Sequence, residues 1–385
     1  MNTLFLALSY LKYHWLRSAI LVLVAAMILS VPLISQVLLD GARTSLTDRA
    51  EATPLVLGNR GSQLDLVMNA LYFSDDRAEP VTMAATEEVW DSATAVPIPL
   101  NTAFETNGAR IVGTSLDYFE FRDLTIADGR QLAILGEAVL GAATAHRLGL
   151  GPGDTIVSAP QNLFDLDGVY PLELNIVGVL AATGTPDDEA VFVDIATTWV
   201  ISGIGHGHDG VVSADADADE VVANAAIVEF NRITADNIDS FHFHGDPATY
   251  PVSGILVVPD DDRAGTILRG RYLDTANPLQ IIVPEEVVGE LVDRIFRIKS
   301  LLDAVTLIVG AAALAAVGLA VFLSYRLRAQ EMQTAFKLGA RPGMILRLLA
   351  SETVILLTFA GLIAVAIVLA VQQSGDTIVA WLLAT

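Results

Sequence analysis

The clearest pattern in the chain is its distribution of apolar residues, which form long runs near both ends and short, broken runs in the middle. Three runs reach the length of about 20 residues that a helix needs to cross a bilayer. They lie within residues 18–39, 291–325 and 352–371. A lone segment in lipid can satisfy its backbone hydrogen bonds only as a helix. The pattern therefore predicts an α-helical transmembrane bundle with three spans.

The first run has an alternative interpretation, a cleaved signal peptide. Its apolar stretch is longer than the 7–15 residues of a signal-peptide core, and no small-x-small cleavage motif follows it. In the preceding residues 1–17, Leu4, Leu8 and Leu11 recur at helical spacing beside Lys12, as in a helix lying at a membrane surface. We therefore expect a retained span at residues 18–39, preceded by an amphipathic helix on the cytoplasmic side.

Basic residues set the expected orientation, because loops rich in Lys and Arg stay in the cytoplasm. Lys12 and Arg17 precede the first span, and five basic residues lie in the loop 326–351 between the other two: Arg326, Arg328, Lys337, Arg341 and Arg347. Both flanks are therefore predicted to be cytoplasmic. The middle, residues 40–290, and the tail 372–385, which has no basic residue, are then outside.

The second span is expected to be longer than the bilayer requires. Leu291, Ile295, Ile298 and Leu302 continue the helical spacing toward the N-terminus. We predict a helix that leaves the membrane on the outer side and then spans it, over residues 291–325.

The middle alternates short β-type runs with turn signals, which predicts an α+β extracytoplasmic domain. A short helix is expected at residues 141–148, ended by Gly149. Residues 221–229 are compatible with a helix or a strand. Strands are predicted at residues 110–113, 137–140, 155–157, 174–180, 190–194 and 254–258.

Composition excludes several functions. The net charge of −23 lies almost wholly in the middle, and such an acidic surface repels nucleic-acid phosphates. The 385-residue chain contains no cysteine, so it has no disulfide, no thiolate metal site and no cysteine nucleophile. It also lacks the G-x-x-x-x-G-K-[ST] loop of an ATPase, a G-x-S-x-G elbow and an H-E-x-x-H motif. We therefore expect no enzymatic activity from this chain alone.

The outer segment resembles a known domain in the order of its motifs. The first motif is Gly113-Thr114-Ser115-Leu116-Asp117-Tyr118-Phe119, and it is followed by Asp128-Gly129-Arg130. The next motif is Leu135-Gly136-Glu137-Ala138-Val139. The last two are Ile176-Val177-Gly178-Val179-Leu180 and Val191-Phe192-Val193. This succession resembles the periplasmic core domain of the MacB/FtsX-like ABC transporter permeases. The resemblance implies a permease in the bacterial inner membrane, with several spans and a large periplasmic domain.

The cytoplasmic loop carries a second resemblance to the same family, which implies docking of a cytoplasmic ABC ATPase dimer. An ordinary interfacial loop that merely obeys the charge rule is the alternative. The residues that the resemblance assigns to docking are Arg328, Glu331, Phe336, Leu338, Gly339, Ala340 and Arg341.

The chain departs from the family in its number of spans, since such permeases usually have four. Only residues 372–385 follow the third span. The fourth helix is therefore expected to be missing, shortened or replaced by residues 377–383. The resemblance further implies a homodimer with a second permease copy, and the outer domain is suited to a periplasmic partner protein.

The histidines are the one chemically unusual group. Four of the six form two pairs, His206 with His208 and His242 with His244, within an insertion predicted at residues 201–250. Residues i and i+2 of a strand point to the same face, so such pairs can bind Zn²⁺. Ordinary polar loops are the alternative interpretation.

Two function classes follow. The first is a permease that couples ATP hydrolysis by a separate ATPase to movement of the outer domain, with zinc at the histidines as its one candidate cofactor. The second is a membrane-anchored sensor or scaffold that binds metal or protein without transport.

The orientation predicts a specific reporter pattern. A topology reporter fused at Ser213 is expected to be active only outside the cytoplasm, and one inserted at Gln333 only inside. Activity of paired reporters in whole cells measures this. The reverse pattern at either position contradicts the orientation and the permease interpretation with it.

Overall fold

The computed structural model of the chain describes residues 2–74, 79–160, 171–208, 230–327, 334, 337 and 342–383. It divides into two compact units. One contains residues 1–45 and 291–385, and the other contains residues 46–290. The second unit falls within the outer segment predicted from the sequence.

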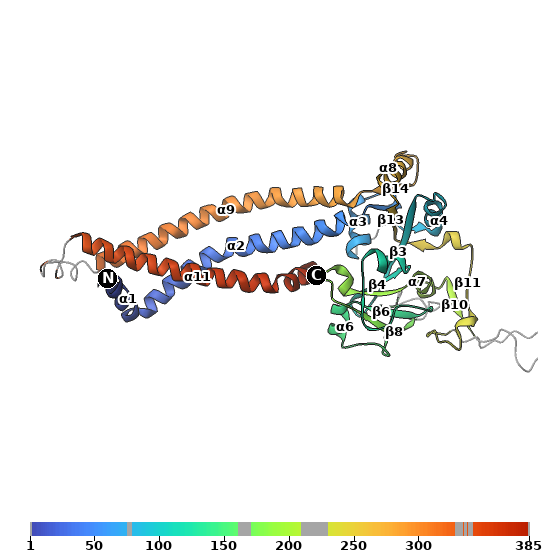
Figure 1. Cartoon of the computed structure of the whole chain (residues 1–385), viewed down its shortest axis with the longest axis horizontal. Coiled ribbons are helices and arrows are strands. Elements are labelled where there is room, and N and C mark those ends of the chain that lie inside the picture. The colour runs from blue at the N-terminus through green and yellow to red at the C-terminus, as the bar shows by residue number, and fades with distance from the viewer. Residues whose placement is uncertain are drawn as a thin grey trace, which may run out of the picture. The chain divides into compact units, whose positions relative to one another are not determined.

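The first unit is built from helices (Figure 1). They are α1 (Asn2–Tyr13), α2 (Trp15–Glu51), α9 (Pro284–Leu327) and α11 (Pro342–Leu383), of which α2 and α9 continue into the second unit. Within the first unit, Ala25 and Ala26 of α2 pack against Ala360 of α11. Such small side chains allow close helix contact in a membrane, where apolar burial alone provides little attraction between helices.

Two segments among the described residues are long and apolar enough to cross a membrane. They are the helix Trp15–Glu51 and the stretch Ala350–Gln372, which include the first and third predicted spans. In α9, at the second predicted span, a shorter apolar stretch covers Asp303–Ala312. Large apolar side chains such as Leu307 and Leu362 are exposed along these helices, which favours a lipid or protein cover.

Two predicted boundaries differ from the structure. Helix α9 begins at Pro284, before the predicted start at residue 291. Helix α11 continues to Leu383, so the predicted tail 372–385 is largely helical. In both cases the helix extends past the apolar stretch, because backbone hydrogen bonds continue through polar residues that the apolar pattern does not mark.

The second unit is an α+β domain around a ten-stranded mixed sheet (Figure 1). Its strand order is β14-β1-β13-β3-β4-β9-β6-β8-β5, with β7 paired to β8. The pairs β4–β9 and β6–β8 are parallel, whereas the other pairs are antiparallel. The strands are β1 (Leu55–Asn59), β3 (Ala95–Thr106), β4 (Ala109–Thr114), β5 (Ile126–Gly129), β6 (Glu137–Leu140), β7 (Thr155–Val157), β8 (Glu173–Leu180), β9 (Ala190–Asp194), β13 (Gly254–Pro259) and β14 (Leu279–Ile282).

Shorter elements surround this sheet. Two small ribbons pair β10 (Gly205–Gly207) with β11 (Phe241–Phe243), and β12 (Pro251–Val252) with β2 (Val81–Thr82). The helices are α3 (Gln63–Tyr72), α4 (Met83–Asp91), α5 (Asp117–Phe121), α6 (Ala142–Leu148), α7 (Ile195–Ile201) and α8 (Asp262–Arg271), with 3-10 turns η1 (Pro186–Glu189), η2 (Ile238–Ser240) and η3 (Pro247–Thr249).

All six predicted strands are confirmed, as β4, β6, β7, β8, β9 and β13. The predicted short helix is α6, and Gly149 ends it with a positive φ of 67°. A left-handed residue after the last turn is a common helix end, and glycine adopts it without strain. Residues 221–229, left open between helix and strand, lie outside the described residues.

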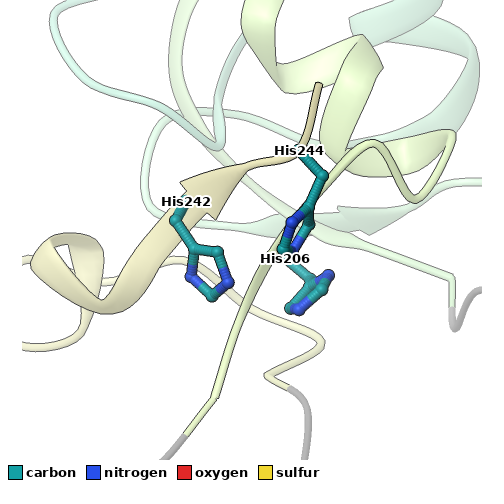
Figure 2. A group of neighbouring side chains, drawn as sticks. All are labelled: His206, His242 and His244. Atoms are coloured by element: carbon teal, nitrogen blue, oxygen red, sulfur yellow. The ribbon is translucent and has the colours of Figure 1, made fainter. Parts of the chain in front are cut away.

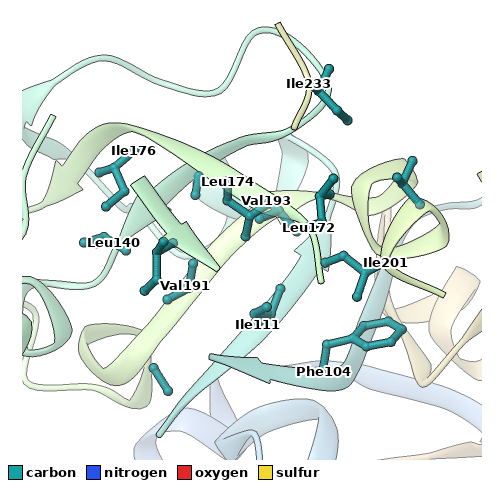
Figure 3. Close-up of a cluster of buried hydrophobic side chains, with 14 of the residues drawn as sticks. Phe104, Ile111, Leu140, Leu172, Leu174, Ile176, Val191, Val193, Ile201 and Ile233 are labelled. Carbon is teal, nitrogen blue, oxygen red and sulfur yellow. The ribbon is translucent and has the colours of Figure 1, made fainter. Parts of the chain in front are cut away.

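Two apolar clusters hold the second unit together. One lies around β4, β6, β8 and β9 and includes Ile111, Leu140 and Val191 (Figure 3). The other lies around β1, β13 and α4 and includes Leu57 and Ile255. Residues 138–140 of β6 and 190–193 of β9 are buried and apolar without alternation, which is the pattern of strands covered on both faces.

Gly141, which precedes the first residue of α6, lies against the backbone of η1. A Cβ atom at this position would lie 2.3 Å from the backbone oxygens of both Asp187 and Asp188. Only a residue without a side chain permits this approach, which positions η1 beside α6.

Replacing Gly141 with Ala is expected to destabilise the second unit by about 1–3 kcal/mol, the usual cost of overpacking. The full chain in detergent can be unfolded with heat or denaturant to measure this. Gly151→Ala is the matched control, since a Cβ there meets no atom within 4 Å. Equal stability of the two variants contradicts a steric role for Gly141.

Candidate functional site

The four histidines singled out from the sequence lie together on one face of the β10–β11 ribbon. The strands are antiparallel, and His206 is directly opposite His242. The segment Gly-His-Gly-His faces the segment Phe-His-Phe-His, at residues 205–208 and 241–244. Because side chains alternate between the faces of a strand, this pattern collects the histidines on one face.

Glycine and phenylalanine make up the opposite face. A Cβ on Gly205 would lie 2.5 Å from the Phe243 ring, and one on Gly207 would lie 2.5 Å from the Phe241 ring. The rings therefore occupy the space above the glycines. Phe241 packs against the cluster shown in Figure 3. The Phe243 ring lies 6.4 Å from that of Trp199, so the apolar face attaches the ribbon to the domain.

The histidine rings are close enough to share an ion. Ring centroids are 4.8 Å apart for His206 and His242, 4.9 Å for His206 and His244, and 4.9 Å for His242 and His244. One ring nitrogen from each of these three lies within 4.8 Å of the others. The rings converge on a common space from the two strands (Figure 2). His208 is adjacent, with centroids 5.6 Å from His206 and 5.1 Å from His242.

A hydrogen bond determines which ring nitrogen of His242 is available to a metal. Its Nδ1 lies 3.1 Å from the backbone oxygen of Ser240. A carbonyl oxygen can only accept, so Nδ1 carries the proton and Nε2 keeps a lone pair. Histidines that bind metals commonly use this arrangement, with one nitrogen held by a carbonyl and the other on the ion. This contact occupies Nδ1 of His242, so Nε2 is the atom that can bind a metal.

A second feature, at the end of α2, is a buried ion pair. Arg49 Nη1 lies 2.7 Å from Asp187 Oδ2, and Arg49 Nη2 lies 3.0 Å from Asp187 Oδ1. The two side chains are only 5% and 1% exposed. The Tyr118 hydroxyl accepts from Arg49 at 2.9 Å and donates to Asp187 at 2.6 Å. The Arg49 Nε also donates to the Leu71 carbonyl, so the guanidinium joins four parts of the domain.

The same contacts determine the protonation states in this network. Burial alone would raise the pKa of Asp187, but the Arg49 charge and hydrogen bonds from Arg49, Tyr118 and Thr185 hold that pKa below its ordinary value. Burial, followed by the Asp187 charge, raises the pKa of Tyr118. Asp187 is therefore charged and Tyr118 neutral near pH 7. The stabilisation from Asp187 is present above its ordinary pKa and is lost as pH falls through its lowered pKa.

The sequence reasoning missed this ion pair. Tyr118 was noted only as part of a family motif, and Arg49 and Asp187 are separated by most of the domain sequence. The only local signal is that Arg49 is a basic residue between two acidic ones, Asp48 and Glu51, a short way after an apolar span. Its partner could not be identified among the many carboxylates.

The predicted docking residues receive no structural description. Arg328, Glu331, Phe336, Leu338, Gly339, Ala340 and Arg341 all lie outside the described residues.

Comparison with known proteins gives one family match. The model of the MacB-like periplasmic core domain matches residues 18–230. The match extends beyond the motifs noted in the sequence, so His206 and His208 fall within it, whereas His242 and His244 follow it. No curated protein matches the chain.

Solved structures that match the chain include two transporter domains. The periplasmic region of MacB from Actinobacillus actinomycetemcomitans is 10% identical, with a TM-score of 0.36, covering 64% of this chain and 97% of that one. The extracellular domain of the noncanonic ABC-type transporter YknZ from Gram-positive bacteria is 11% identical, with a TM-score of 0.34, covering 59% and 98%.

The buried ion pair predicts strong coupling between its partners. Arg49→Met is expected to lower the free energy of unfolding by about 3–5 kcal/mol, because Asp187 is left buried and unpaired. Asp187→Asn is expected to be destabilising as well, but the double variant should lose less than the sum of the two. Denaturant unfolding of the full chain in detergent measures all three.

Arg232→Met is the matched control for this cycle. Arg232 lies 3.4 Å from Glu173 in a partly exposed pair, and such pairs contribute at most about 1 kcal/mol. Additive effects of Arg49→Met and Asp187→Asn, or a loss no larger than that of Arg232→Met, contradict the proposed importance of the buried pair.

Proposed function

Since the chain belongs to the MacB-like periplasmic core domain family, we propose that it couples ATP hydrolysis by a separate cytoplasmic ATPase to movement of its outer domain. The family is that of the MacB/FtsX-like ABC transporter permeases, whose members are membrane subunits. The observation that carries the proposal is the family match over residues 18–230, more than half of the chain. The apolar helices before and after the outer domain support it.

The connections of α2 and α9 to the outer domain are suited to transmitting movement to it. Helix α2 leads into β1, and β14 leads into α9. Strands β1 and β14 are direct neighbours, with Val56 opposite Ile282 and Leu57 opposite Ile281. A displacement of either helix along its axis therefore acts on one of two paired strands at the edge of the sheet. Backbone hydrogen bonds make both elements stiff enough to transmit such a displacement.

The buried ion pair supports the same mechanism at α2. Arg49 belongs to the last turn of this helix, and its bonds to Asp187, Tyr118 and Leu71 attach that turn to the domain core. Movement of α2 then displaces the attached core as well as β1. Without this attachment, the chain between helix and sheet would absorb part of the motion.

On the cytoplasmic side we propose that the ATPase binds the loop 326–351. Its support is the resemblance of the sequence around Glu331 and Gly339 to the family, together with the basic residues expected of a cytoplasmic loop. A second permease copy completes the assembly, since an ABC ATPase acts as a dimer. Three spans, with the outer domain in the periplasm, complete the proposed topology.

The alternative function, a membrane-anchored sensor or scaffold without transport, is supported only by the histidine face. A metal-binding face is compatible with a transporter as well, so it does not discriminate between the two. The family match favours the permease.

The docking proposal predicts that replacing Glu331 and Gly339 weakens binding of the ATPase. Interface residues of this importance each contribute more than about 1 kcal/mol, so the double variant Glu331→Ala/Gly339→Val is expected to bind at least about tenfold more weakly. Copurification of the chain with its ABC ATPase partner measures this, with Gln333→Ala as control. Undiminished copurification of the double variant means that another surface binds the ATPase.

A further inference from the structure

We propose that the histidine face of the β10–β11 ribbon binds one Zn²⁺ ion through His206, His242 and His244, with His208 as the fourth ligand. This site is separate from ATPase coupling and does not depend on the proposed transport function. It goes beyond the sequence expectation because the structure selects one face, a three-histidine core and a binding atom on His242.

The donor set determines which ions fit. The face offers imidazole nitrogens, and the chain contains no cysteine. Imidazole suits Zn²⁺ and neighbouring transition metals, whereas Ca²⁺ and Mg²⁺ require oxygen ligands. Ring planes at 36°, 68° and 77° to one another for the three core histidines approach the common space from different directions. Four imidazoles can complete the tetrahedral coordination that Zn²⁺ takes at structural sites.

The separations are suitable for the ion. Zn–N bonds of about 2.0–2.1 Å in a tetrahedron place the nitrogens about 3.3 Å apart. The three core nitrogens already lie within 4.8 Å of one another. Side-chain rotation can close the remaining distance, since His206 and His242 are only partly buried and His244 is exposed. The paired backbone of the ribbon does not have to move.

The surroundings hold the histidines in place for this role. The bond from His242 Nδ1 to the Ser240 carbonyl leaves Nε2 as the metal-binding atom. The bond from the His244 backbone N–H to the Ile204 carbonyl, at 3.0 Å, continues the ribbon beyond Phe243. The phenylalanine rings that lie over the glycines attach the other face to the domain, so the histidines are presented on a supported ribbon.

A bound ion would connect two segments that are far apart in the sequence. It would join β10, which follows α7, to β11, which precedes η3. Cross-links between distant segments stabilise the folded state by restricting the unfolded chain. The four-ligand site therefore stabilises the ribbon and leaves no open position for catalysis.

Zinc titration of the full chain tests the proposal. The protein is purified in detergent with an affinity tag that lacks histidine, stripped with a chelator, and titrated with zinc chloride by calorimetry at about 0.5 M salt. Salt at this level screens weak binding to the acidic surface. We expect one zinc per chain with a Kd below micromolar. Cobalt in place of zinc should give the visible absorption of a tetrahedral complex.

Single substitutions identify the ligands. His206→Ala, His242→Ala and His244→Ala are each expected to weaken binding by about 100-fold or more, and His208→Ala by about tenfold, since even indirect partners of a metal contribute 10–100-fold. His146→Ala is the matched control, because His146 is an exposed histidine on α6 outside the cluster. Circular dichroism verifies that each variant folds, and exposed His244 is the substitution least able to disturb the domain.

Three results would overturn the proposal. They are no zinc uptake at micromolar concentration, uptake that His244→Ala leaves unchanged, and equal losses in His146→Ala and the core variants. Unchanged affinity in His208→Ala would overturn the assignment of the fourth ligand. Because ATPase copurification is measured separately, failure of the zinc site and failure of the permease proposal can be told apart.

Discussion

The outer domain depends on one buried charge being paired. Arg49 is placed inside the domain by the last turn of α2, and a buried guanidinium without a partner would cost several kcal/mol. Asp187 provides the opposite charge, and Tyr118 bonds to both. For Asp187 to reach this position, η1 must lie against the start of α6, where only Gly141 leaves enough room. The need to pair the Arg49 charge thus determines the positions of the end of α2, of η1 and of the family motif that contains Tyr118.

Aromatic packing surrounds this charged centre and keeps water away from it. The Phe192 ring on β9 lies 5.6 Å from the Tyr118 ring and 5.4 Å from the Phe119 ring. Low polarity around a hydrogen-bonded ion pair strengthens the bonds within it. It also makes the pair intolerant of losing either partner. The end of α2 is therefore attached more specifically than an apolar contact alone would allow, which the proposed transmission of motion through α2 requires.

The histidine face is held in place by aromatic packing and not by a buried ion pair. It lies on a two-stranded ribbon, which is marginal by itself and needs packing against a larger body. Phenylalanine rings over glycines provide that packing on one face and leave the other for polar side chains. The net charge of −23 attracts cations to the chain in general, whereas the proposed selection of a transition metal depends on the convergence of the imidazoles. Support and selectivity thus come from opposite faces of the same four-residue segments.

The sequence by itself determined the elements whose signals are local. Apolar length indicated the candidate spans, short apolar runs between turns indicated six strands, and Gly149 indicated the end of α6, because each depends on neighbouring residues only. The two histidine pairs are visible in the sequence as well, but the sequence does not show that they share one face of a ribbon. Only the tertiary structure decided that His206 lies opposite His242, that β1 pairs with β14, and that Arg49 meets Asp187. Those contacts join distant segments, and a chain with 45 acidic residues offers too many equivalent partners for sequence alone to choose among them.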